Sequence, residues 1–116
     1  MFSRSLVAAT IKPLMLAILS DGEAYGYQII QRVQRISRGQ IDLTTGTLYP
    51  HLHRMEADGL VDSSWKEVPD APRRKYYNLT AAGRKALAAE KQQWLDANAI
   101  LTTLWGGSHS MEGLGA

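Results

Sequence analysis

The chain has 116 residues, which is enough for one domain with a modest core, and 45% of them are hydrophobic. It contains no cysteine, which excludes a disulfide scaffold, a cysteine nucleophile and any cysteine-ligated metal site. The formal net charge is only +2, so the distribution of charge along the chain is more informative than its sum.

The first predicted helix covers about residues 6–19. Ile11, Met15 and Ile18 recur at the three- and four-residue steps of one helical face. Pro13 has no N–H and clashes with the preceding turn, so it predicts either the first turn of the helix or a kink.

The longest apolar stretch in this first helix, residues 14–19, is too short to cross a bilayer, which takes ~20 apolar residues. Lys12 and Pro13 also interrupt the apolar region that a signal peptide would need. We therefore expect a cytoplasmic protein with no membrane partner.

Two further helices are predicted over about residues 25–37 and 45–58, joined by a short link. Ile29 and Val33 mark the apolar stripe of the first, and Leu48 and Leu52 mark that of the second. Two helices joined by a tight turn form a helix-turn-helix pattern.

The second helix of this pair begins with hydroxyl-bearing and small residues. An α-helix fits the ~12 Å major groove, where its N-terminal residues reach the base edges. Gly46 would let the backbone approach the DNA closely. Thr44 is predicted as an N-cap whose hydroxyl accepts a hydrogen bond from an early backbone N–H, and capping alone is the alternative to a DNA contact. His51 and His53 diverge by ~200° around the helix, so they cannot share a metal ion, and we predict no metal or cofactor. The predicted DNA contacts on these two helices are Tyr25, Thr44, Thr45, Gly46, Thr47, Tyr49, His51 and Arg54.

A β-hairpin is predicted next, with strands over about residues 60–67 and 75–79 and a turn over residues 68–72. The basic triplet Arg73, Arg74 and Lys75 stands where the turn re-enters the second strand. Its charges suit backbone phosphates or a narrow minor groove. Alternatively, they form a charged strand that blocks aggregation. Three helices followed by a hairpin are the order of a winged helix-turn-helix.

Three stretches of the sequence resemble the PadR family of transcriptional regulators: residues 25–30, 46–60 and 73–84. They stand in the same order and with matching spacing, and the similarity covers about residues 6–104. The resemblance implies a repressor that acts as a homodimer, binds a palindromic operator in double-stranded DNA and is released by a small, often aromatic, ligand. The short form of the family, with a single C-terminal dimer helix, fits this length.

The resemblance has two departures. Ala71-Pro72 stands in the wing loop where glycine is common, so the tip is expected to be stiffer. Thr45 stands where a proline is frequent. Neither change removes a side chain of a DNA-contacting type.

The last predicted helix, about residues 81–104, carries a heptad-like seam that one short domain leaves uncovered. A second copy is the natural partner, and a twofold pairing would place two recognition helices about one DNA turn, ~34 Å, or a multiple apart. The alternative is that this helix packs only onto the first helix of its own chain. The predicted dimer interface comprises Leu14, Ile18, Leu87, Lys91, Trp94, Leu95, Leu101, Leu104 and Trp105.

Trp94 lies near the middle of that seam, where two symmetry-related indoles could flank a flat ligand. By the resemblance to multidrug-sensing members of the family, Trp94 would line a pore at the dimer centre together with Pro13, Ala17 and Asn98. These four residues form two i, i+4 pairs, so each pair shares a helix face. The alternative is that Trp94 is a packed interface anchor.

The fold class expected from these observations is mainly α with a small β-hairpin. A winged helix-turn-helix domain would cover residues 1–80, a C-terminal dimerisation helix residues 81–105, and a disordered tail residues 106–116. The sequence lacks a glycine-rich phosphate loop, a nucleophile elbow and an HExxH pattern, so we expect a DNA-binding regulator and not an enzyme. Two alternatives stay open: a winged-helix adaptor that binds proteins, and a repressor that has no small-molecule effector.

Overall fold

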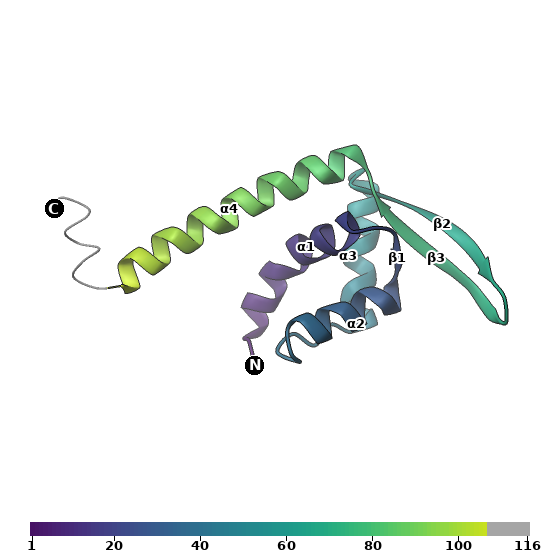
Figure 1. Ribbon diagram of the computed structural model, residues 1–116, viewed down its shortest axis with the longest axis horizontal. Coiled ribbons are helices and arrows are strands. Elements are labelled where there is room, and N and C mark those ends of the chain that lie inside the picture. Colours follow the sequence, from purple (N-terminus) through teal and green to yellow (C-terminus); the bar gives the residue numbers. More distant parts are fainter. Residues whose placement is uncertain (107–116) are drawn as a thin grey trace.

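The fold is taken from a computed structural model that describes residues 1–106. Apart from Gly106, the predicted tail lies outside the described residues. The elements in chain order are α1 (Arg4–Ser20), β1 (Ala24–Tyr25), α2 (Gly26–Ile36), α3 (Thr45–Ala57), β2 (Val61–Val68), β3 (Ala71–Leu79) and α4 (Ala81–Trp105) (Figure 1). The predicted class, mainly helical with a hairpin and a long last helix, is confirmed.

Helices α1, α2 and α3 surround the hydrophobic core. Met15 and Leu16 of α1, Ile29 of α2, and Leu48 and Leu52 of α3 are fully buried. These residues recur at helical spacing, which is why periodicity identified the three helices.

Helix α1 starts earlier than predicted. Ser3 is its N-cap, and the Ser3 hydroxyl accepts a hydrogen bond of 3.2 Å from the N–H of Leu6. Pro13 therefore lies well inside the helix, and of the two predicted alternatives, the first turn or a kink, the first turn is excluded.

The link between α2 and α3 contributes two residues to the core. Ile41 and Leu43 are 5% and 4% exposed. Gly39 adopts a positive φ of 78°, which reverses the chain after α2, and the Ser37 hydroxyl accepts a hydrogen bond of 3.1 Å from the N–H of Ile41. By contrast Ile36, which lies three residues after Val33 at the end of α2 and so continues the apolar spacing of that helix, is 60% exposed.

The sheet has three antiparallel strands in the order β1-β3-β2. Strands β2 and β3 form the wing, the long hairpin that leaves the body of the molecule beside α3 (Figure 1). Its turn is only Pro69-Asp70, shorter than the predicted turn over residues 68–72, and Asp70 has a positive φ of 61°. Pro72 lies within β3 beside an irregularity in the register, where a missing N–H is tolerated.

Helix α4 begins at the base of the wing and extends away from the body (Figure 1). The Thr80 hydroxyl accepts a hydrogen bond of 3.0 Å from the N–H of Gly83 and also lies 2.7 Å from the carbonyl oxygen of Gly59. Gly83 is the one buried residue of this helix, and every residue from 91 to 102 is exposed. The second half of α4 is therefore not covered by its own chain.

Within residues 1–106 no helix is both long enough and apolar enough to cross a membrane.

Candidate nucleic-acid interface

The start of α3 is an exposed polar surface. Thr44, Thr45, Gly46 and Thr47 are all exposed. Thr44 occupies the N-cap position as predicted, but its hydroxyl does not cap a backbone N–H; it lies 3.2 Å from the hydroxyl of Thr47. The prediction of that capping bond was therefore wrong.

Gly46 has no close neighbour in the described chain. A Cβ built on it would meet only the Thr44 hydroxyl oxygen, at 3.9 Å. The fold thus gives no packing reason for a glycine at this position, and the backbone of the first turn of α3 is open to an external partner.

Tyr49 connects α3 to the start of α2. It is half-buried, and its hydroxyl lies 2.4 Å from where a Cβ on Gly26 would stand, so Gly26 makes room for it. The ring of His53 lies 6.3 Å from that of Tyr49. His51 is half-buried and Arg54 is exposed. No group of three or more potential metal ligands occurs among the described residues.

Tyr25 fixes the start of α2 against the wing. It pairs with Tyr76 in the sheet, and the two rings meet edge to face with their centroids 5.3 Å apart. The guanidinium of Arg74 lies 4.4 Å above the Tyr25 ring, a cation–π contact. The predicted contact residues Tyr25 and Arg74 therefore lie together.

The alternation of β3 divides the basic triplet between the two faces of the wing. On one face, Lys75 lies opposite Trp65 across the strands, and the guanidinium of Arg73 lies 5.3 Å from the Trp65 ring. On the other face, Arg74 lies opposite Lys66.

The outer face of the wing is bound to the loop before β1. The Lys66 ammonium forms an ion pair with the carboxylate of Glu23 and lies 5.1 Å from the centroid of the Tyr76 ring. Tyr76 in turn contacts Tyr25, so these side chains hold the wing to the start of α2.

Glu56 near the end of α3 holds the inner face of the wing. Its carboxylate accepts a hydrogen bond of 2.5 Å from the Ser63 hydroxyl of β2 and lies 3.8 Å from the Lys75 ammonium of β3. One carboxylate thus fixes both strands relative to α3.

The buried Tyr77 adds a polar group near this carboxylate. The Tyr77 hydroxyl has no hydrogen-bond partner among the described residues. Burial, followed by the negative charge of Glu56 and the neighbouring Tyr49, raises the pKa of Tyr77 above its ordinary value of 10.0.

A cleft of about 450 Å³ lies between the start of α2, α3 and the wing. It brings together aromatic and cationic side chains from all three elements. The residues that line it are Tyr25, Gly26, Tyr27, Tyr49, His53, Trp65, Arg73, Arg74, Lys75 and Tyr77. Five of them were predicted as DNA contacts; Trp65 was not, because an aromatic residue in a strand ordinarily indicates packing.

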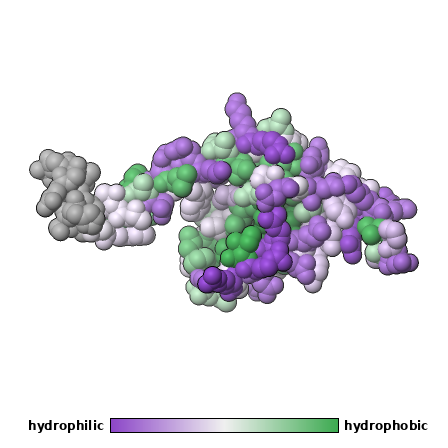
Figure 2. Space-filling view, viewed as in Figure 1, coloured by the Kyte–Doolittle hydropathy of each residue, from purple (hydrophilic) through white to green (hydrophobic). Residues whose placement is uncertain are grey.

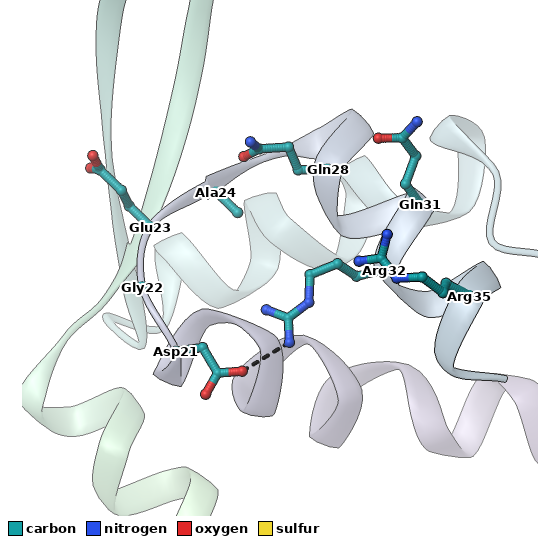
Figure 3. A pocket seen from close by; sticks show the side chains of 8 residues that line it. All are labelled: Asp21, Gly22, Glu23, Ala24, Gln28, Gln31, Arg32 and Arg35. Atoms are coloured by element: carbon teal, nitrogen blue, oxygen red, sulfur yellow. Dashed lines mark hydrogen bonds and ion pairs between the residues drawn. The ribbon is translucent and has the colours of Figure 1, made fainter.

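The arginines of α2 lie in a different pocket, which Figure 3 shows beside the end of α1. Arg32 forms an ion pair of 2.9 Å with Asp21 and lies 3.5 Å from the carbonyl oxygen of Ile18. Arg35, Gln28 and Gln31 line the same pocket. Arg32 is thus directed towards α1 and is partly neutralised there.

The predicted dimer residues differ in how exposed they are. Ile18 is 4% exposed and belongs to the core of its own chain, so its assignment to the dimer interface is corrected: a partner can contact little of it. Leu14 and Leu87 are half-buried against that core. Those left exposed along α4 are Lys91, Trp94, Leu95, Leu101, Leu104 and Trp105.

The predicted ligand residues do not meet within one chain. Trp94 is 37% exposed and lines a shallow pocket with Ala9, Glu90, Gln93 and Ala97. Pro13, Ala17 and Asn98 are not part of the lining of that pocket.

Comparison with known proteins agrees with this geometry. Residues 15–89 match the family described as "Transcriptional regulator PadR-like family". The chain is 37% identical over 89 residues to "Transcriptional regulator Rv3488" of Mycobacterium tuberculosis (strain ATCC 25618 / H37Rv), a match that covers 77% of this chain and 79% of that protein.

Two solved structures have the same fold. One is a PadR family transcription regulator from Clostridium difficile R20291, 34% identical, with a TM-score of 0.71 and coverage of 83% of this chain and 98% of that one. The other is a PadR-like transcriptional regulator from Bacillus cereus strain ATCC 14579, 28% identical, with a TM-score of 0.79 and coverage of 90% and 99%.

Proposed function

The chain belongs to the PadR-like family of transcriptional regulators, and from that premise we propose that it is a homodimeric repressor that binds a palindromic operator and is released by a small planar aromatic ligand. As a member of this family it is a regulator of transcription and not an enzyme. We propose that residues 1–80 form the DNA-binding domain and that residues 81–105 form the helix through which two copies of the chain dimerise.

The observation that carries the DNA-binding proposal is the position of the wing beside α3. The cleft between them holds Arg73, Arg74 and Lys75, and the exposed first turn of α3 carries three threonine hydroxyls. Cations beside a helix that presents its N-terminal turn suit a duplex, because the cations bind phosphates while the helix enters the major groove. The proposed contacts are Tyr25, Thr44, Thr45, Gly46, Thr47, Tyr49, His51, Arg54, Arg73, Arg74 and Lys75.

The dimer proposal is supported by the exposed half of α4, on which apolar side chains are visible in Figure 2. Leu95, Leu101, Leu104 and Trp105 are between 43% and 73% exposed. Apolar area of this extent on one helix is typical of a surface that another chain covers. A second α4 is the proposed partner, because the same seam on two copies is self-complementary under twofold symmetry.

The ligand proposal places a flat aromatic molecule between the two copies of Trp94. Pro13, Ala17 and Asn98 would complete the site in the dimer. A ligand that prefers one angle between the α4 helices shifts the population towards that angle. The two wings and recognition helices would then no longer fit both half-sites together.

Salt dependence of duplex binding tests the electrostatic part of this function. Four cations in each chain, Arg54, Arg73, Arg74 and Lys75, are proposed to contact phosphates. Each contact contributes about −0.9 to the slope of log K against log salt, so a bound dimer should give a slope of about −7. A slope near zero, with binding unaffected by Arg74→Ala, would contradict DNA binding and favour a protein–protein adaptor.

Trp94 fluorescence separates a ligand-responsive repressor from one without an effector. We expect planar aromatic compounds to quench Trp94 emission and to weaken operator binding in the same concentration range. The measurement uses a variant that carries both Trp65→Phe and Trp105→Phe, so that Trp94 is its sole tryptophan and the only source of indole emission. The absence of quenching across a panel of such compounds would contradict the ligand part of the proposal and leave DNA binding in place.

A further inference from the structure

Trp65 is a large apolar side chain that the fold does not bury. It lies in β2 of the wing and is 57% exposed. Burying apolar surface stabilises a fold in proportion to the area removed from water, and an indole left largely exposed forgoes much of that gain. The position of Trp65 is therefore better explained by an external partner than by folding.

The surroundings of Trp65 indicate the chemistry of that partner. Lys75 lies opposite it across the strands, and the guanidinium of Arg73 lies 5.3 Å from its ring. The same cleft is lined by Tyr49 and His53 of α3. The indole is thus on the face of the wing that looks towards α3, between cations and the element proposed to enter the major groove.

We propose that Trp65 is a DNA-contacting residue of the wing, whose ring packs against a deoxyribose of the backbone while Arg73 beside it binds the neighbouring phosphate. The inference rests on the proposed function and deepens it. A partner that matches the guanidinium of Arg73 is anionic, and one that covers the indole is apolar, whereas Lys75 already lies 3.8 Å from the Glu56 carboxylate. The sugar–phosphate backbone alternates these two properties at short spacing, and it is the surface that lies next to a helix seated in the major groove.

Because the Trp65 ring carries no charge, its contribution to DNA affinity can be distinguished from that of the cations by its salt dependence. An uncharged ring releases no counter-ions from DNA, whereas each lysine or arginine that meets a phosphate does. Removal of Trp65 should therefore lower affinity equally at low and high salt. Removal of Arg73 should lower affinity most at low salt.

The test is fluorescence anisotropy with a fluorescein-labelled, mixed-sequence duplex of about three helical turns, titrated with the full chain at several salt concentrations. We expect Trp65→Ala to weaken binding about tenfold with the slope of log K against log salt unchanged. Arg73→Ala should weaken binding and make the slope shallower by about one per chain. Trp65→Phe, which keeps an aromatic ring, should remain within about threefold of the original protein.

Fluorine NMR of the unmutated chain carrying fluorotryptophan gives a second readout that does not depend on the stability of a variant. Trp65→Phe assigns the Trp65 signal, and the signals of Trp94 and Trp105 act as internal references. We expect the duplex to shift the Trp65 signal. A shift caused by an acidic peptide but not by the duplex would overturn the proposal.

The outcomes separate this inference from the function on which it rests. If the original protein binds the duplex but the Trp65 signal and the affinity of Trp65→Ala are both unchanged, the inference is wrong and the DNA-binding proposal stands. If the original protein does not bind the duplex at low salt, the proposed function itself is contradicted.

Discussion

Gly46 and Tyr77 are two residues whose identities the packing of the chain does not explain. Gly46 stands in open space at the start of α3, since a Cβ there would meet only one atom, at 3.9 Å. Packing therefore does not require a glycine at this position. Tyr77 is the reverse case: it is 0% exposed, and its hydroxyl has no hydrogen-bond partner within residues 1–106. Each residue departs from what folding alone would favour, so each makes a prediction.

Gly46→Ala should separate stability from DNA binding. Alanine favours the helix by up to about 1 kcal/mol over glycine, so the free energy of unfolding should stay the same or rise. The added methyl group would keep the backbone of α3 away from the duplex, and we expect affinity to fall about tenfold. Chemical denaturation and anisotropy measure the two quantities. Unchanged affinity would show that the first turn of α3 does not approach DNA closely.

Tyr77→Phe should stabilise the protein, because it removes a buried hydroxyl whose lack of a partner costs about 1–3 kcal/mol. The gain should grow at alkaline pH. The raised pKa of Tyr77 means that above pH 10.0 the unfolded chain loses this proton while the folded chain keeps it. The folded state then binds more protons than the unfolded state, so the stability of the original protein falls as pH rises.

Thermal unfolding of both proteins from neutral pH to above pH 10.0 measures this difference. A Tyr77→Phe variant that is less stable than the original protein at neutral pH would indicate that the hydroxyl has a partner in solution.

At the scale of elements, the periodicity of apolar residues predicted the helices, whose formation depends on local sequence. The apolar stripes of α1, α2 and α3 follow the period of a helix that buries one face. Strand β1 could not be predicted, because two residues, Ala24 and Tyr25, have no period of their own. They form a strand only because Tyr76 and Tyr77, far along the chain, lie beside them.

The candidate site was predicted only in part for a similar reason. The basic triplet of residues 73–75 is visible in the sequence, but its division between two faces depends on the register of β2 with β3. Trp65 enters the site through the same register. The ion pair of Arg32 with Asp21 depends on how α2 packs against α1, which no local pattern states.

Gly83 allows close packing where the wing joins α4. A Cβ on Gly83 would lie 2.1 Å from the carbonyl oxygen of Leu60 and 2.5 Å from a side-chain atom of Leu79. The first contact is with backbone, which cannot turn aside. We expect Gly83→Ala to lower the free energy of unfolding by about 1–3 kcal/mol. Gly46→Ala, the same substitution in an open part of a helix, is the matched control; equal stabilities of the two variants would contradict this close packing.

At the scale of the whole molecule, α4 extends the chain away from its body (Figure 1). One chain is 63 Å in its longest extent, because α4 leaves the body after its first turns. The first half of the helix packs against α1, where the ammonium of Lys12 lies 3.8 Å from the Glu90 carboxylate, whereas every residue from 91 to 102 is exposed. The remaining apolar seam would be covered in the proposed dimer.

Leu101→Glu should disrupt that dimer. Leu101 is 43% exposed in the single chain, so a charge there costs little until a partner buries it. We expect sedimentation equilibrium to give a monomer for this variant and a dimer for the original protein. Thr103→Glu is the matched control, because two residues turn the helix by about 160° away from Leu101 and Thr103 is not one turn from any other residue of the proposed interface. A dimer that survives Leu101→Glu unchanged would place the interface elsewhere.

The central claim is that two copies of this chain read one palindromic site in DNA. Its most direct test is to incubate the purified full chain with a library of random duplexes at moderate salt, to recover the bound fraction and to sequence it. We expect an enriched inverted repeat with its half-site centres one helical turn apart, about 10 base pairs, or a multiple of this. A bound fraction with no enriched sequence, or with a single site that is not repeated, would contradict it.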